Sequence, residues 1–204
     1  MMSRGDHVED DPDLSAYART NRDDMYRLLT GEDPNSIKEM VRLLGGPKNV
    51  AGIVGRTRRT VERWVTEAGQ KISKPRGDAL QRLQQAAQHA RSTRVGRQRA
   101  VENRRSALIR NHGARLVGTT TAGPIASGRS YTRRRHYPEP GMHVDVDTMN
   151  STFDAYLQDG EDEAYATFCN GFGTAYEPTG HDPEEVDWLF TDLSGLDLGP
   201  DLTD

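Results

Sequence analysis

Charge is distributed unevenly along the 204 residues of this chain. Residues 36–135 hold 23 Lys or Arg against 5 Asp or Glu, whereas residues 136–204 hold 17 Asp or Glu and no Lys or Arg. A block as basic as the first attracts polyanions such as nucleic acid. The acidic block is then a solubilising tail, a surface for a basic partner, or a competitor with nucleic acid for the basic block.

Composition narrows the class of protein further. Hydrophobic residues make up 34% of the chain, which is low for a globular domain, so part of the chain is expected to be extended or disordered. No apolar run reaches the roughly 18–20 residues that cross a bilayer, and the acidic N-terminus lacks the pattern of a secretion signal. Cys169 has no second cysteine with which to form a disulfide or a CxxC metal pair, and it is expected to be buried. A reducing, cytoplasmic location is therefore predicted.

Apolar residues at helical spacing predict short helices in the first half of the chain. One helix is expected over Leu14–Leu29, a second begins after Ser36, and a later one begins near Asp78. From Arg91 to Arg115, basic residues surround the predicted helix axis. This segment therefore has little apolar surface to bury, and we expect it to become ordered on a polyanion.

Two helices with a short connection are predicted from Pro47 onward. Pro47 suits a first helical position, Gly55 ends the first helix, and Thr57 caps the second. In the second helix, Val61 and Trp64 lie at i and i+3 and are expected to face the core. This spacing fits a helix-turn-helix, whose second helix enters the major groove of DNA.

Basic residues around this motif are predicted to contact DNA, either at guanine edges or at phosphates. The candidates are Arg56, Thr57, Arg58, Arg59, Arg63, Lys74 and Arg76, together with Arg97, Arg104 and Arg105 of the basic helix. A helical hairpin with a solvated basic face is the alternative explanation of the same spacing.

The pattern changes at Leu116. The Thr- and Gly-rich residues that follow predict a strand and a turn, and Met142–Asp147 alternate as a short strand. Asp145 and Asp147 would share one face of that strand, exposed to solvent. Two helices are expected next, over 151–157 and 161–176.

The helix-turn-helix residues resemble a known family, the telomere-protecting terminal proteins of linear actinobacterial chromosomes and plasmids. The similarity is densest over 45–83 and continues more weakly beyond. It includes Lys48-x-Val50-Ala51-x-x-x-Gly55-x-x-x-Arg59-Thr60-Val61-Glu62-Arg63-Trp64, then Lys74-Pro75-Arg76-x-Asp78-x-x-x-Arg82-Leu83, and near the C-terminus Phe190-Thr191-Asp192 with Leu196-Asp197.

The resemblance implies a protein that is bound covalently to the 5′ ends of a linear replicon. In that role a hydroxyl side chain acts as primer, a DNA polymerase adds the first deoxynucleotide to it, and a telomere-binding partner protein recruits it. Mg²⁺ and the deoxynucleotide come with the polymerase, so the chain needs no cofactor of its own and is not itself an enzyme.

Priming requires an exposed hydroxyl that can attack the α-phosphate of a nucleotide, with cations near the phosphates. The Thr- and Ser-rich residues 119–130 are predicted to form a flexible loop that suits this task. By the resemblance, the acceptor falls shortly after a proline, on Ser127, and Thr121, Thr120 and Ser130 are the alternatives. An ordinary turn rich in small polar residues would have the same composition.

The predicted fold is mainly α with a small α+β C-terminal part and disordered acidic termini. Its expected parts are an acidic leader at 1–13, a helix-turn-helix domain at 14–76, a basic helical segment at 77–115, an α+β region for priming or dimerisation at 116–176, and an acidic tail at 177–204.

Three functions fit these features. The first is a nucleoid-associated terminal protein that binds DNA and primes replication of telomeric ends. The second is a helix-turn-helix transcriptional or plasmid-copy regulator without priming activity, and the third is an adaptor whose acidic end recruits a replication protein. No membrane partner and no metal site are expected, and a homodimer through residues 142–176 is left open.

Overall fold

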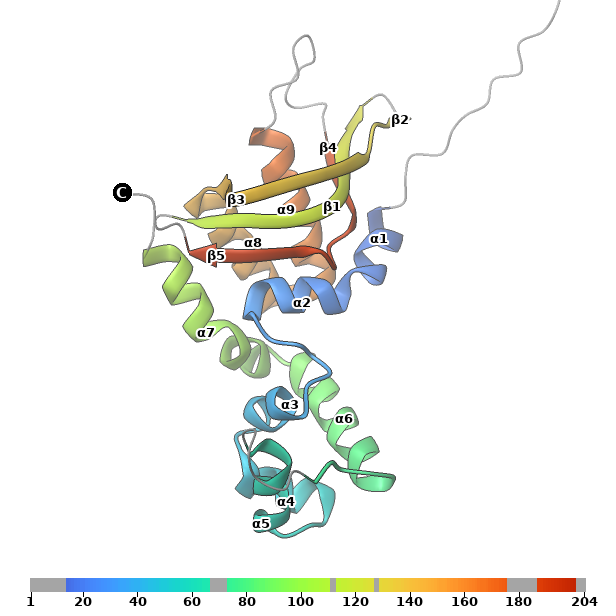
Figure 1. Ribbon diagram of the computed structural model, residues 1–204, viewed down its shortest axis with the longest axis vertical. Coiled ribbons are helices and arrows are strands. Elements are labelled where there is room, and N and C mark those ends of the chain that lie inside the picture. The colour runs from blue at the N-terminus through green and yellow to red at the C-terminus, as the bar shows by residue number, and fades with distance from the viewer. Residues whose placement is uncertain (1–13, 67–72, 111–112, 127–128, 176–186, 201–204) are drawn as a thin grey trace, which may run out of the picture.

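The structure is mainly helical with one antiparallel sheet near its C-terminal end, which confirms the predicted fold class (Figure 1). It is a computed structural model, and it describes residues 14–66, 73–110, 113–126, 129–175 and 187–200. The expected leader at 1–13 lies outside the described residues. The helices before the sheet are α1 (Leu14–Thr20), α2 (Arg22–Thr30), α3 (Ile37–Leu43), α4 (Pro47–Val54), α5 (Arg58–Val65), α6 (Asp78–Arg91) and α7 (Arg94–Arg110).

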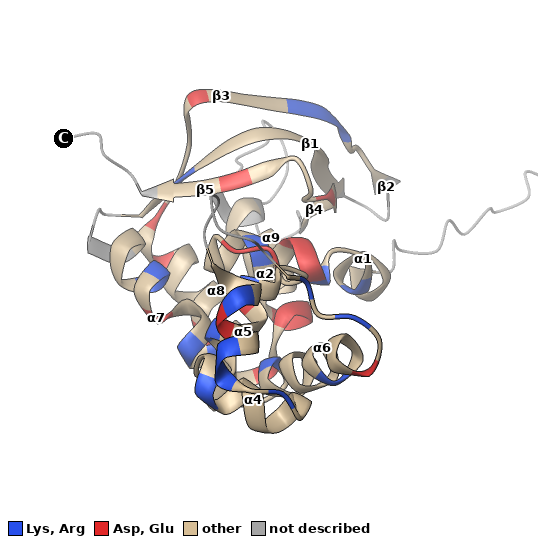
Figure 2. Cartoon of the chain, turned by 60° about the horizontal axis from the view of Figure 1, so that its bottom comes forward, with Lys and Arg blue, Asp and Glu red and all other residues tan. Residues whose placement is uncertain are grey.

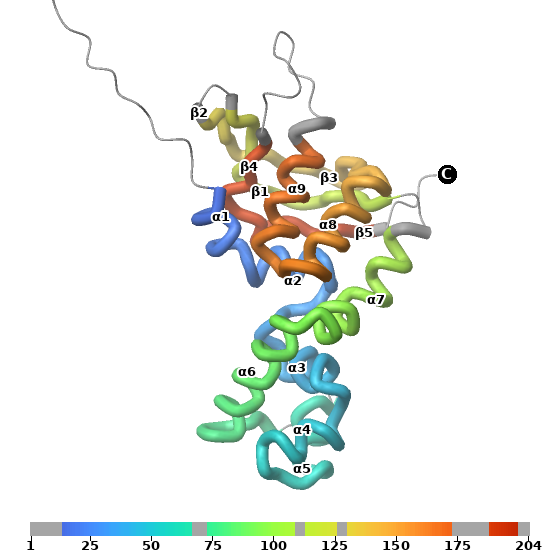
Figure 3. Tube along the Cα trace, turned by 180° about the vertical axis from the view of Figure 1, so that it is seen from behind, coloured from blue at the N-terminus to red at the C-terminus, as the bar shows by residue number. Residues whose placement is uncertain are grey.

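Strand β1 (Ala114–Ala126) is the centre of the sheet because every other strand pairs with it, each time antiparallel. One edge of β1 pairs with β3 (Arg133–Val144), and the end of β1 forms a short ladder with β2 (Arg129–Ser130). The other edge pairs first with β5 (Leu196–Pro200) and then with β4 (Asp187–Asp192). Helices α8 (Val146–Asp159) and α9 (Glu161–Ala175) cover one face of this sheet (Figure 3).

The buried apolar residues form one continuous core. It extends from Val61 and Trp64 in α5, through Leu83 in α6, to the sheet. Under the sheet, aromatic rings of α9 and β4 meet, with the Phe172 and Phe190 ring centroids 5.0 Å apart. Cys169 is buried there, as predicted.

The first predicted helix is divided into α1 and α2 at Asn21. The Asn21 side chain is 2% exposed, its amide donates to the Tyr17 carbonyl, and its Oδ1 accepts from the Leu193 N–H at 2.9 Å. The prediction of one helix was therefore wrong, because Asn21 bonds to a segment far away in the sequence.

Residues 119–126 were expected to be a flexible loop but belong to β1. The β-branched threonines fit a pleated strand, and β1 finds pairing partners on both edges. Residues 187–200, expected in an acidic tail, form β4 and β5. Buried side chains such as Leu196 and Leu198 alternate there with the exposed Asp197, which is the pattern of a half-buried strand.

The paired carboxylates do not share a strand face. β3 ends at Val144, Asp145 is the N-cap of α8, and Asp147 lies in the first turn of that helix. The Asp145 carboxylate accepts from the backbone N–H and the hydroxyl of Thr148, both at 2.8 Å. Although burial acts to raise the pKa of Asp145, these bonds outweigh it and lower the pKa.

Helix α7 is shorter than the expected basic helix, because Arg91 ends α6 and Arg115 lies in β1. It also has an apolar contact surface, with Ala100, Val101 and Leu108 buried against its neighbours. The expectation that this helix needs a polyanion to become ordered is wrong, since α2, α6 and α8 already pack against it.

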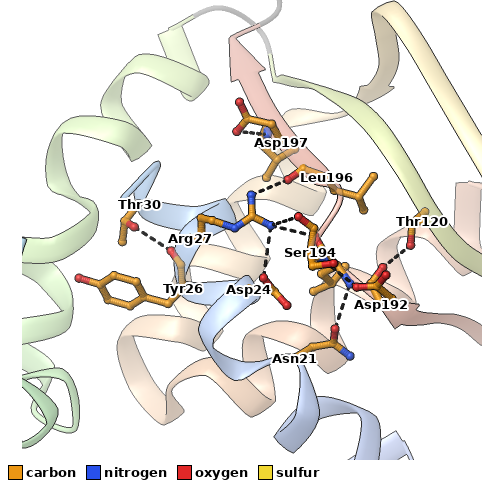
Figure 4. Close-up of polar contacts among 12 residues, drawn as sticks. Asn21, Asp24, Tyr26, Arg27, Thr30, Thr120, Asp192, Ser194, Leu196 and Asp197 are labelled. Carbon is orange, nitrogen blue, oxygen red and sulfur yellow. Dashed lines mark hydrogen bonds and ion pairs between the residues drawn. The ribbon is translucent and has the colours of Figure 1, made fainter. Parts of the chain in front are cut away.

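The Arg27 guanidinium links helix α2, near the start of the chain, to the residues that connect β4 and β5, near its end (Figure 4). It donates to the carbonyls of Leu193, Ser194 and Leu196 at 2.8–3.0 Å, in the connection between β4 and β5. Backbone carbonyls in a partly buried turn need such donors.

Replacing this guanidinium is expected to destabilise the fold. Arg27→Ala leaves three carbonyls without their donor, so the free energy of unfolding should fall by about 1.5–3 kcal/mol in urea denaturation. Arg94→Ala, which removes an exposed arginine of α7, is the matched control and should change it by less than about 0.5 kcal/mol. An Arg27→Ala variant as stable as the control would contradict this account.

Candidate nucleic-acid interface

Helices α4 and α5 form the predicted helix-turn-helix geometry. Gly55 ends α4 in the left-handed conformation, with φ 63°, and Pro47 is at the first position of α4. Thr57 caps α5, and its hydroxyl oxygen accepts from the Thr60 N–H at 3.2 Å. Val61 and Trp64 are buried, as expected, so α5 is anchored by one face and exposes the other.

The exposed face of α5 is basic. Arg56, Arg59 and Arg63 are exposed, and no described residue forms an ion pair with them, whereas Arg58 pairs with Glu62 at 2.6 Å. Helical spacing places Arg59 and Arg63 together, since they are four residues apart. Figure 2 shows this concentration of Lys and Arg at the α4 and α5 end of the molecule.

Further cations surround this face. The predicted Lys74 and Arg76 are exposed just before α6. Arg82 of α6 is exposed and was not among the predicted DNA contacts. It lies beside the turn between α4 and α5, because its Nη1 is 3.7 Å from the position that a Cβ atom on Gly55 would occupy. Lys48 at the start of α4 is also exposed. Packing of α6 on α4 brings Arg82 here, which helical spacing alone does not reveal.

The three candidate arginines of α7 are instead bonded within the protein. Arg97 is 8% exposed and donates to the carbonyls of Ser92, Leu157 and Gln158. Arg104 donates to the Leu198 carbonyl and Arg105 pairs with Asp154 at 2.7 Å. Because these guanidinium groups hold α8 and β5 in place, we leave Arg97, Arg104 and Arg105 out of the basic surface around α5.

The candidate acceptor hydroxyls differ in accessibility. Thr120 is 2% exposed and donates to the Asp192 carbonyl, Thr121 is half-buried, and Ser130 is exposed. Ser127 lies outside the described residues. Thr119, opposite His136 in the ladder, has its Oγ1 3.0 Å from the His136 Nδ1. Thr119, Thr120 and Thr121 lie in β1 and Ser130 lies in β2, in the sheet at the end of the molecule far from α5 (Figure 1).

A cavity of about 410 Å³ between α2, α6 and α9 has polar walls. Its Arg91 pairs with Asp23 at 3.0 Å and with Glu161 at 3.3 Å. Beside it, the bond from Arg22 lowers the pKa of Asp162 below its ordinary range. Since its main charges are paired with one another, we assign no ligand to this cavity.

A buried hydrogen bond between Tyr26 and Glu39 links α2 to α3, the helix that precedes α4 and α5. The Tyr26 hydroxyl donates to the buried Glu39 carboxylate at 2.6 Å, and Arg42 donates to the same carboxylate at 2.6 and 2.7 Å. Burial, together with the Glu39 bond, raises the pKa of Tyr26 above its ordinary value. The hydroxyl therefore stays protonated and keeps α2 bonded to α3.

Within the described ranges, no three His, Cys, Asp or Glu side chains are arranged to hold a metal ion, and no helix there is long and apolar enough to span a membrane. Searches against protein-family models, curated proteins and solved structures found no match to the chain.

Replacing each of two glycines of α4 and its turn with alanine should change the free energy of unfolding in opposite directions. Gly55→Ala forces a side chain into the left-handed region and should lower the free energy of unfolding by about 1–2 kcal/mol. Gly52 lies inside α4 with open space around its position, so Gly52→Ala should raise it by up to about 1 kcal/mol. Equal effects of the two variants in thermal or urea denaturation would show that the turn does not constrain Gly55.

Proposed function

We propose that this protein binds duplex DNA with α5 in the major groove and serves as a terminal protein, a protein primer at the ends of a linear replicon. The observation that carries the DNA-binding part is that Arg59 and Arg63 of α5 are exposed and have no ion-pair partner among the described residues. Arg59 and Arg63 lie about one helical turn apart on the exposed face of a helix whose other face is fixed by Trp64. A helix held in this way can enter the groove without rearranging.

The cations have different roles in this proposal. Arg59 and Arg63 face base edges or phosphates from the recognition helix, while Arg56, Lys74 and Arg82 contact phosphates beside it. Thr57 acts as the helix cap, and Arg58 is held by Glu62 and contributes less. Guanidinium groups suit both tasks because their fork geometry matches guanine and phosphate.

The priming part comes from the resemblance to terminal proteins. The acceptor oxygen attacks the α-phosphorus of a deoxynucleoside triphosphate, the bond to the β-phosphate breaks, and pyrophosphate leaves with Mg²⁺ supplied by the polymerase. The hydroxyl proton passes to a base of the polymerase site. Ser127, Thr121 and Ser130 are the candidate acceptors, whereas Thr120 is excluded by its burial and its bond to Asp192.

Duplex binding should depend on α5. Arg59→Ala combined with Arg63→Ala should weaken binding at least tenfold, and the slope of log K against log salt should fall by about 0.9 for each lost phosphate contact. Arg94→Ala is the matched control and should leave the slope unchanged. Fluorescence anisotropy with a labelled duplex measures both quantities, and a flat salt response of the unmodified chain would refute duplex binding.

Priming should attach one nucleotide to the protein. After incubation with Mg²⁺, each deoxynucleotide and an extract that primes a known terminal protein, intact-protein mass spectrometry should show the mass of one added nucleoside monophosphate. Loss of this mass in Ser127→Ala identifies the acceptor, and its persistence moves the acceptor to Thr121 or Ser130. No added mass, with duplex binding intact at a palindromic site, would support the regulator instead.

A further inference from the structure

A second cationic surface lies at the end of the molecule opposite α5. In the C-terminal half of the chain every arginine lies at or before residue 135, and Arg133 and Arg134 are exposed with no described partner. Figure 2 shows the part of β3 near β2 as basic, with an acidic residue, Glu139, further along the strand. We call Tyr131, Arg134 and His136 the hairpin surface, and Arg133 is exposed on the opposite face of the strand.

Tyr131 is the unusual member of this surface. Its side chain is 55% exposed, which makes it one of three exposed large hydrophobic side chains among the described residues. Its backbone is nevertheless held firmly, since its N–H donates to the Pro124 carbonyl at 2.9 Å. The Tyr131 carbonyl oxygen also lies over Gly123, because a Cβ atom added to Gly123 would be 2.4 Å from that oxygen. A fixed backbone therefore presents an aromatic ring to solvent.

The neighbouring strands add polar groups on the uncovered face of the sheet. Opposite residues in an antiparallel ladder share a face, so Thr121 lies beside Arg134 and Thr119 beside His136. Arg135, by contrast, stacks on Trp188 with 4.8 Å to the ring centroid and donates to the Ala122 carbonyl. Arg135 is thus structural, while Arg134 remains available on the uncovered face.

We infer that the hairpin surface binds single-stranded DNA. The exposed Arg134 matches its phosphates, and the exposed aromatic ring of Tyr131 stacks on an unpaired base. A duplex hides its base faces and would leave Tyr131 without a partner, so the surface favours a single strand. The DNA strand would lie beside Thr121 and Ser130. That it serves there as the template for nucleotide addition to the acceptor hydroxyl rests on the proposed function.

The test uses the full chain and a labelled oligothymidylate of about 15 nucleotides in fluorescence anisotropy. Tyr131→Ala should weaken binding about fivefold to hundredfold, and Tyr131→Phe, which keeps the ring, should bind as the unmodified chain does. Arg134→Ala should lower the salt slope by about 0.7, the value of one lost phosphate contact to a single strand. Circular dichroism should show unchanged folding, since these side chains are exposed.

The matched control is the Arg59→Ala and Arg63→Ala chain, which should lose duplex binding and keep oligothymidylate binding. If it loses both while Tyr131→Ala loses neither, α5 binds all DNA and the inference fails. Equal competition by polyglutamate, independent of Tyr131, would also overturn it by showing a general polyanion surface. Nucleotide attachment that fails while Tyr131-dependent binding persists would refute priming and leave this site standing.

Discussion

The bonds between α2 and the connection of β4 to β5 determine how the rest of the molecule is assembled. Arg27 satisfies three carbonyls there, and Asn21 accepts from Leu193. These contacts span about 170 positions of sequence and keep β4 and β5 against one edge of β1. With that edge occupied, β3 pairs on the other, which places the hairpin surface at the far end of the sheet.

Opposite charges from the two halves of the chain pair with one another within the protein. Arg105 pairs with Asp154, Arg104 contacts Asp197, and Arg91 pairs with Glu161. The acidic half thus neutralises Arg104 and Arg105 of α7 and Arg91 at the end of α6, and it contains strands and helices as well as acidic side chains. Arg59 and Arg63 of α5 have no such partners among the described residues, so arginines at equal density along the sequence are not equally available to a ligand.

Local signals made α4 and α5 predictable, because Pro47, Gly55 and Thr57 act through their own backbone neighbours. The helices α8 and α9 followed from the same kind of pattern, with α8 starting earlier once Asp145 capped it. The lengths of β1, β4 and β5 depended on pairing with distant segments, which a short sequence window does not contain. At the candidate sites, sequence identified the α5 arginines, but neither Arg82 nor the burial of Arg97 and Thr120 could be read from spacing.

The outer edge of β3 has a consequence for the protein at high concentration. Among the described strands β3 pairs only with β1, so its other edge presents backbone groups that could extend the sheet into a neighbouring molecule. Pro138 and Pro140 interrupt that row of donors, and the successive charges of Arg133 to Arg135 repel an identical edge. Arg134, which would attract a nucleic acid strand, thus also contributes to protecting the protein from self-association into fibres.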